Sequence, residues 1–314
     1  MDLRSRWLPA ALAAGFVLLM AGAARLTGCA EVLFPETAAL LCGAWLQPRQ
    51  AWNVDRPRML LLMGCGATCG LLLNLLVPWP VWGRAVLGYA FAAAMMCLVG
   101  ADMTPMLSAI VLPVLLGTDT WAYPLAVVCI VSALELGQVG LERAGLREPV
   151  DYHVLRNPPR VALAEWGRRW AVFALLSAPA YLTGHNLFAV PPLLVAFTEL
   201  TRPDMTLRLR PVRAWGTLAL AAVIGELCRS AVEVAGAPTP LMALVAFLGV
   251  VLVWDALKAW LPPAGAVALL ALLVPYPGPG AYVACVATGA ALWVAVAMTF
   301  PGVRPGHGGA EREL

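Results

Sequence analysis

Long runs of apolar residues, separated by short polar stretches, dominate the pattern along this chain. Six runs precede the hydrophilic stretch 141–165, and six follow it. In the first half they cover residues 7–25, 32–46, 57–77, 82–100, 104–117 and 120–140. In the second half they cover residues 166–183, 187–200, 213–235, 239–257, 262–275 and 280–300. Continuous runs of this kind, without period-two alternation, predict membrane-crossing α-helices rather than strands of a β-barrel.

The second and fifth runs of each half are shorter than the others. They contain 14 or 15 residues, which make about 21 Å of helix at about 1.5 Å per residue. A hydrocarbon core is about 30 Å thick. These four segments are therefore either short, steep spans or re-entrant half-helices. Both alternatives leave an even number of crossings in each half.

The composition excludes the main soluble classes. Of the 314 residues, 61% are hydrophobic, and only 21 are basic and 18 acidic. One soluble core of this length could not bury that much apolar surface. The chain also has no solvated basic domain that would bind nucleic acid. We therefore expect an all-α polytopic membrane protein, and not a soluble enzyme, a disordered chain or a disulfide-rich secreted domain.

The two halves of the chain repeat each other. Residues 34–49 match 189–204 at an offset of 155, and Gly70 corresponds to Gly225 at the same offset. Residues 104–109 match 262–267 at an offset of 158. A three-residue difference in one loop explains the change of offset. Because each half has an even number of crossings, the pattern predicts two parallel pseudo-symmetric repeats of about six apolar segments, including short broken or re-entrant helices.

This duplication divides the chain into four parts. Residues 1–140 form the first membrane repeat and residues 166–300 the second. Residues 141–165 are an arginine-containing linker, and residues 301–314 a polar tail. Arginines concentrate at the amino end, the linker, the tail and the loops 48–58 and 201–213, so all of these are expected in the cytoplasm. The expected location is the inner membrane, with both termini cytoplasmic.

The amino end has a second interpretation. Residues 26–29 resemble a lipoprotein cleavage box after the run 7–24. Arg25, between the run and the box, and the length of the run both favour retention as a first membrane helix.

Short motifs in both halves resemble those of the HPP family of integral membrane proteins. The family motif is His-Pro-Pro followed by Ala-Gly-Ala and an apolar helix, and residues 262–266 reproduce it apart from the histidine. Leu261 stands at the histidine position, and Met103 stands there in the first half. Residues 46–49 resemble the Gln-Pro-Arg that follows an upstream apolar stretch in the family. The resemblance implies two fused HPP-like units, and some family members are linked to nitrite transport.

Charges inside the apolar runs are the first candidates for a substrate site, because each is expensive to place in hydrocarbon. Glu226, Arg229 and Glu233 lie on one predicted helix, and Glu226 and Arg229 share a face. Arg229 could attract an anion that Glu226 holds or releases. Alternatively, the two side chains form an ion pair that only joins helices. Asn74 is the counterpart of Arg229 in the first half.

The proline-started short segments are the second candidates. Proline suits the first turn of a helix, and a helix amino end attracts anions. Broken segments at matching places in two halves are typical of transporter sites. A simple helix start at the membrane surface is the alternative interpretation. The candidate residues here are Thr37, Thr104, Pro105, Ser108, Pro262, Pro263 and Gly265.

Together these patterns predict a membrane transporter or channel for a small solute, most simply a monovalent inorganic anion such as nitrite, with its site between the repeats. Scattered histidines and the lack of a Ser–His–acid set give no support to catalysis, and no cofactor or metal is expected. The expected partners are the solute, the lipid bilayer and a second copy or a membrane subunit. The alternative is a non-transporting subunit that binds a partner through the linker. A lipid- or quinone-modifying enzyme is a weaker third candidate.

Overall fold

A computed structural model describes residues 3–155, 158–202, 205–275 and 278–301, and its regular elements there are all helices. The long helices are α1 (Leu3–Thr27), α3 (Arg56–Leu76), α4 (Val81–Val99), α6 (Ala122–Arg143), α7 (Pro159–Leu182), α9 (Pro211–Ala235), α10 (Thr239–Leu257) and α12 (Ala281–Met298). The short ones are α2 (Glu36–Leu41), which continues as a π-helical turn (Cys42–Leu46), α5 (Pro105–Leu116), α8 (Pro191–Leu200) and α11 (Pro263–Leu270). Short 3₁₀ turns cover Ala30–Val32, Asn186–Ala189 and Thr206–Leu209.

Each predicted apolar segment overlaps one of these α-helices, so the expected all-helical membrane fold is confirmed. Six of the helices are long and apolar enough to cross a membrane: α1, α3, α4, α6, α10 and α12. The helices α7 and α9 are as long, with 24 and 25 residues, but they carry more charged side chains. Helix α7 begins at Pro159, inside the stretch expected to be linker, because a helix can continue through polar residues beyond the end of its apolar run.

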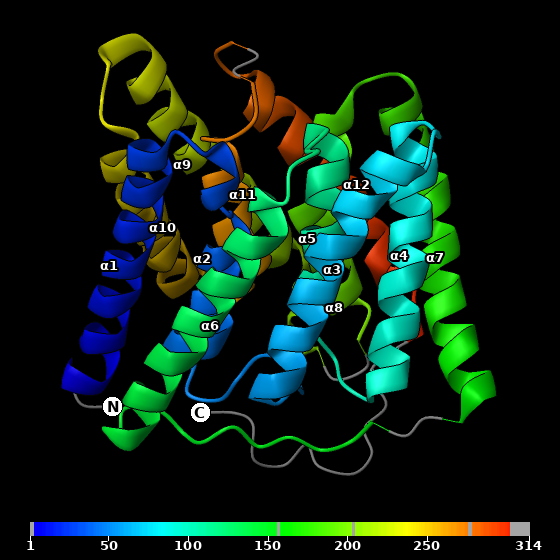
Figure 1. The fold of residues 1–314 in the computed structure, drawn as a ribbon, viewed down its shortest axis with the longest axis horizontal. Coiled ribbons are helices and arrows are strands. Elements are labelled where there is room, and N and C mark those ends of the chain that lie inside the picture. Colours follow the sequence, from blue (N-terminus) through cyan, green and yellow to red (C-terminus); the bar gives the residue numbers. More distant parts are fainter. Residues whose placement is uncertain (1–2, 156–157, 203–204, 276–277, 302–314) are drawn as a thin grey trace.

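The long helices surround the short ones. Figure 1 shows α2, α5, α8 and α11 in the middle of the bundle, with α1, α10, α4 and α7 toward its sides. Every residue of α2, α8 and α11 is buried. Large apolar side chains on the long helices point outward instead, and Leu98, Leu136 and Leu227 are 82%, 74% and 65% exposed. An apolar exterior of this extent fits contact with lipid.

Each short segment enters the bundle through a 3₁₀ turn or a few non-helical residues and continues as a helix of half length. The start of α1, the loop 47–55 and residues 144–155 mark one end of the bundle, at the bottom of Figure 1, which we call the lower end. Helices α2 and α8 run from the middle toward this end, whereas α5 and α11 run from the middle toward the opposite, upper end. The short segments are therefore broken crossings of the bundle, and their helices begin in its interior.

Glycines let α3 and α9 lie very close to the short helices. A Cβ at Gly70 would overlap the carbonyl oxygen of Ile110 in α5. A Cβ at Gly225 would meet the carbonyl oxygen of Ala268 in α11 at 2.5 Å. The helices that follow add a tyrosine on each short helix: the hydroxyl of Tyr123 donates to Ala109, and that of Tyr282 donates to Val267. Both short helices are thus held on two sides.

The stretch after α6 is tied to the lower end of the first half. The Asn53 amide donates to the carbonyl of His153 at 2.6 Å and accepts from its N–H at 3.0 Å. Leu155 N–H donates to the Gly100 carbonyl at 2.8 Å. Arg147 is buried and donates to the Gln47 carbonyl. The predicted polar tail lies outside the described residues, except for Pro301.

Candidate functional site

The four short helices begin around one narrow internal void. Each contributes two residues three positions apart, so that one face of its first turn borders the space. The lining residues are Glu36, Ala39, Pro105, Ser108, Pro192, Val195, Pro263 and Ala266. The void has an empty volume of about 170 Å³ and does not admit a water-sized sphere in this conformation. It lies where helices from both halves of the chain meet.

Glu36 is the charged side chain among the residues that line this void. It is 1% exposed, and one carboxyl oxygen, Oε1, accepts a hydrogen bond from the Ser108 hydroxyl. The other oxygen, Oε2, is buried without a hydrogen-bond partner among the described residues. The hydroxyl of the adjacent Thr37 is also buried without such a partner. A buried polar atom without a partner is unfavourable, so a ligand or proton that pairs with it would bind favourably.

The amino ends of α5, α8 and α11 add positive potential to the void, but the prolines there reduce the number of backbone hydrogen-bond donors. Helices α5, α8 and α11 begin there, and helix dipoles favour negative charge at such ends. Pro105, Pro192 and Pro263 carry no N–H. The N–H groups that follow them, on Met106, Leu193 and Ala264, donate to carbonyls of the preceding turn. The site therefore combines a favourable field for an anion with few backbone donors.

A second buried carboxylate lies one helical turn away along α5. Glu199 of α8 is 2% exposed, and its Oε1 accepts from Trp52 Nε1 and from the Thr104 hydroxyl, both at 2.9 Å. Thr104 and Ser108 are four residues apart and share a face of α5. Near the lower end, Arg202 and Asp102 form an ion pair at 3.0 Å. Polar groups thus extend from the void toward the lower end.

Several residues predicted from the sequence lie at or beside the void. Pro105, Ser108 and Pro263 line it. Thr104 binds Glu199, and Pro262 is the residue before the first turn of α11. Gly265 does not leave space for a ligand, because Ala38 of α2 lies against it, 3.0 Å from a Cβ placed there.

The other predicted cluster binds helix ends instead. Arg229 donates to the Leu272 carbonyl at 2.8 Å, beyond the carboxyl end of α11, and pairs with Glu233 at 2.8 Å. Glu226 accepts from the N–H groups of Gly280 and Val283 at the amino end of α12. The predicted side-chain pair between Glu226 and Arg229 is not among the contacts of these residues. Both lie at the opposite end of α11 from the void.

Asn74, in the first half, binds a helix end in the same way as Arg229 does in the second half. Its amide nitrogen donates to the carbonyls of Pro113 and Thr118 at 2.7 Å, and its oxygen accepts from Arg84 at 2.8 Å. It binds the carboxyl end of α5 as Arg229 binds that of α11. These contacts explain the polar residues at positions 74 and 229, and no ligand is needed to explain them.

Glu36 and Glu199 were not among the site residues predicted from the sequence. Each is an acidic residue inside a short apolar run, and Glu36 directly follows the proline that precedes α2. An intramembrane acid beside a helix break was the available signal.

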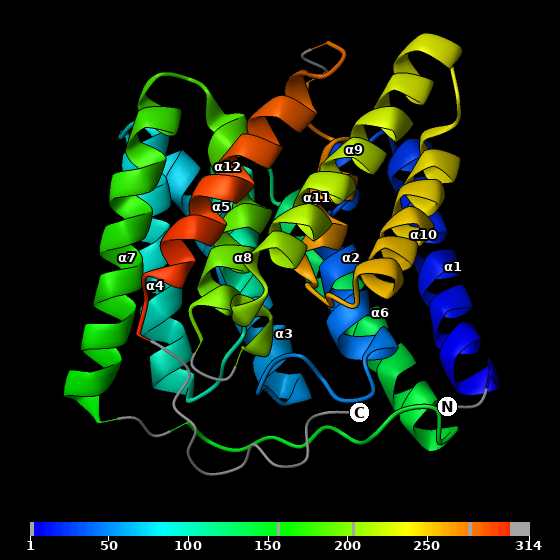
Figure 2. The ribbon, with the colours of Figure 1, turned by 180° about the vertical axis from the view of Figure 1, so that it is seen from behind.

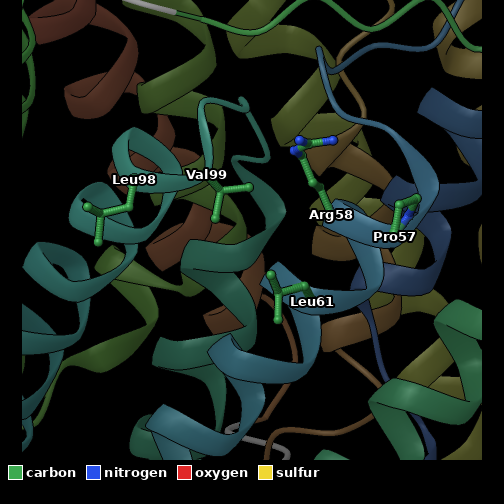
Figure 3. A pocket seen from close by; sticks show the side chains of 5 residues that line it. All are labelled: Pro57, Arg58, Leu61, Leu98 and Val99. Atoms are coloured by element: carbon green, nitrogen blue, oxygen red, sulfur yellow. The ribbon is translucent and has the colours of Figure 1, made fainter.

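An open groove lies at the lower end, away from the four short helices. Its lining residues are Pro57, Arg58, Leu61, Leu98 and Val99 (Figure 3). Its volume is about 460 Å³. Arg58 is already engaged, since it pairs with Asp55 and lies 4.6 Å from the centre of the Tyr152 ring. The groove faces outward between α3 and α4, and it shares no lining residue with the void.

The basic linker makes contacts with the loop 47–55 of the same chain. Burial lowers the pKa of Arg147 to about 10, and the side chain stays protonated at neutral pH. Arg49 forms an exposed ion pair with Glu148 at 2.7 Å. These contacts hold the linker against the loop 47–55 rather than presenting it as a free basic segment.

Comparisons with family models, curated proteins and solved structures found no match to this chain. The resemblance to the HPP family stays a prediction from the motifs.

Proposed function

We propose that this chain moves a small solute across a membrane through the void where α2, α5, α8 and α11 begin. The observation that supports this most directly is Glu36, a buried carboxylate with an unpartnered oxygen at the meeting point of four broken helices. Irregular backbone at mid-membrane depth is tolerated where it is enclosed by protein or lines a path. Transporter sites are commonly built from such half-helices.

The proposal includes a duplicated architecture of two parallel halves. Supporting contacts recur at the offsets of 155 and 158 noted above, with the two tyrosines below offset by 159. Gly70 lies against Ile110, and Gly225 against Ala268. The Tyr123 hydroxyl binds Ala109, and the Tyr282 hydroxyl binds Val267. The site would then lie between the halves, and it would open when α2 and α5 move relative to α8 and α11.

The proposed substrate is a monovalent inorganic anion. The helix amino ends favour negative charge, and the small space favours a small ion. Nitrite is the specific candidate, and it rests on the resemblance to the HPP family. The lower end, which carries most of the arginines, is proposed to face the cytoplasm of a cell with this protein in its inner membrane.

Flux into proteoliposomes tests the proposal. Nitrite, nitrate, formate and chloride would be offered to vesicles that hold the wild type or Ala266→Leu. Ala266 is 1% exposed and lines the void, so the larger side chain should fill it and abolish saturable flux. Ala94→Leu makes the same change at an outward-facing residue of α4 and should leave flux intact.

The outcomes separate three interpretations. Flux that Ala266→Leu abolishes and Ala94→Leu spares supports the void as the path. Flux that survives Ala266→Leu but is lost in Arg229→Ala would move the site to the Arg229 cluster. If none of the four anions crosses at any pH or voltage tested, anion transport is wrong, and a partner-binding role through residues 141–165 becomes the better explanation.

A further inference from the structure

Given the proposed anion transport, on which this inference rests, we propose that Glu36 couples it to protons. The void binds an anion only when the Glu36 carboxyl is protonated, so each anion is carried with a proton.

No positively charged side chain is among the described residues that line the void. The polar neighbours of Glu36 are the Ser108 hydroxyl of α5 and Tyr123 of α6. The Tyr123 hydroxyl already donates a hydrogen bond to the Ala109 carbonyl. Helix α11 presents Pro263 and Ala266, and α8 presents Pro192 and Val195. The buried side chains of α1 are apolar. An anion beside ionised Glu36 would thus meet a like charge in a medium of low dielectric, with no side-chain cation to offset the repulsion.

The void offers an anion few hydrogen-bond donors. Pro105, Pro192 and Pro263 have no N–H, and the next N–H groups along are bonded to the preceding turn. The Ser108 hydroxyl donates to Glu36. An anion in the void therefore needs another donor, and a protonated Glu36 supplies one through its O–H. The unpartnered Oε2 is the atom placed to carry that proton.

Polar side chains between Glu36 and the lower end provide a route for the proton. Ser108 and Thr104 lie on one face of α5, and Thr104 donates to the buried Glu199. Beyond Glu199, Asp102 and Arg202 are partly exposed near the lower end, with 17% and 18% of their side chains accessible. A proton taken from water at one side binds Glu36, and it returns to water at the other side. No bond other than O–H is made or broken.

Anion binding to the purified full-length protein tests the coupling without relying on a variant. Nitrate titrations in two buffers of different ionisation enthalpy give the protons taken up. We expect uptake approaching about one proton per anion, and an affinity that falls about tenfold per pH unit on the alkaline side. An affinity that does not change with pH, or binding without proton uptake, would overturn the inference.

Variants then assign the proton to Glu36. Glu36→Gln keeps an uncharged donor, so nitrate should bind with no proton uptake and no pH dependence. Glu31→Gln makes the same chemical change five residues earlier, outside the void, and should behave as the wild type. Folded Glu36→Gln that binds no nitrate would contradict the role of the neutral carboxyl. If Glu36→Gln does not fold, the wild-type titrations decide.

Vesicles loaded with a pH-sensitive dye, with the membrane voltage held at zero, distinguish this inference from the transport proposal. An inward nitrate gradient should acidify the lumen with the wild type, whereas Glu36→Gln should admit nitrate without acidification. Nitrate flux without acidification in the wild type would overturn the coupling and leave transport standing. Absence of flux and binding for nitrate, nitrite, formate and chloride would overturn both.

Discussion

At the scale of single residues, glycines determine how closely the interior helices approach one another, because a glycine has no side chain. Gly225 of α9 has backbone of α11 directly against it, and a Cβ there would also lie 2.9 Å from the Ala271 side chain. Backbone atoms cannot rotate away as a flexible side chain can. The position therefore requires glycine for packing, although it lies inside a helix, where glycine is intrinsically unfavourable.

Gly225→Ala should therefore destabilise the protein by about 1–3 kcal/mol through overpacking. The measurement is the unfolding midpoint in detergent, followed by tryptophan fluorescence. Gly22→Ala in α1 is the matched control, since no atom lies within 4 Å of a Cβ there. Equal stability of the two variants would show that α9 and α11 can move apart at low energetic cost.

At the scale of elements, charged side chains bind the ends of helices that neighbouring helices present. Glu226 of α9 accepts from two N–H groups at the start of α12, where the helix dipole is positive. Arg229 binds beyond the end of α11, where the dipole is negative. Both charges thus pair with backbone groups at helix ends that have no partner within their own helix.

Removing the carboxylate at the start of α12 tests this role. Glu226→Ala should lower stability by about 1–2 kcal/mol, as expected for loss of a helix cap. Glu233→Ala on the same helix removes a more exposed carboxylate with one ion pair, and its effect should be about 1 kcal/mol or less. Thermal unfolding of both variants in the same detergent gives the comparison. A larger loss for Glu233→Ala would contradict the capping role.

Run length and breaks in the apolar pattern were enough to predict the helices, including the four short ones. The same pattern could not predict which segments meet, because Glu36, Ser108, Pro192 and Ala266 come from four distant parts of the chain. The spacing of Glu226 and Arg229 suggested a pair within one helix. The partners of Glu226 instead lie more than 50 residues away, and contacts of that kind are not encoded in local spacing.

At the scale of the whole molecule, the two ends of the bundle differ in charge. The loop 47–55 and the stretch 144–155 lie at the lower end, with Arg49, Arg56 and Arg147 at or beside them (Figure 2). The upper end carries few arginines, among them Arg25 and Arg84. Such an asymmetry favours insertion with the arginine-rich end in the cytoplasm.

Cysteine labelling in cells tests this orientation. Single cysteines would be placed at Thr183 and at Glu148, exposed positions after α7 and after α6, in a chain whose native cysteines are replaced. A membrane-impermeant maleimide should label Thr183→Cys in intact cells and Glu148→Cys only after permeabilisation. The reverse labelling pattern would place the linker outside the cytoplasm.

The half-length helices also constrain how the protein is made. With 12 and 8 residues, α5 and α11 are too short to span the hydrocarbon when the insertion machinery first meets them, and α2 and α8 bring Glu36 and Glu199 with them. The residues that lead into them are not α-helical, and any backbone groups left unpaired there could not be satisfied by lipid. We therefore expect these short helices to insert stably only after longer helices from both halves surround them. The centre of the molecule should therefore be the last part to assemble. A chain stalled before α12 emerges from the ribosome would lack one of the long helices that surround the short ones.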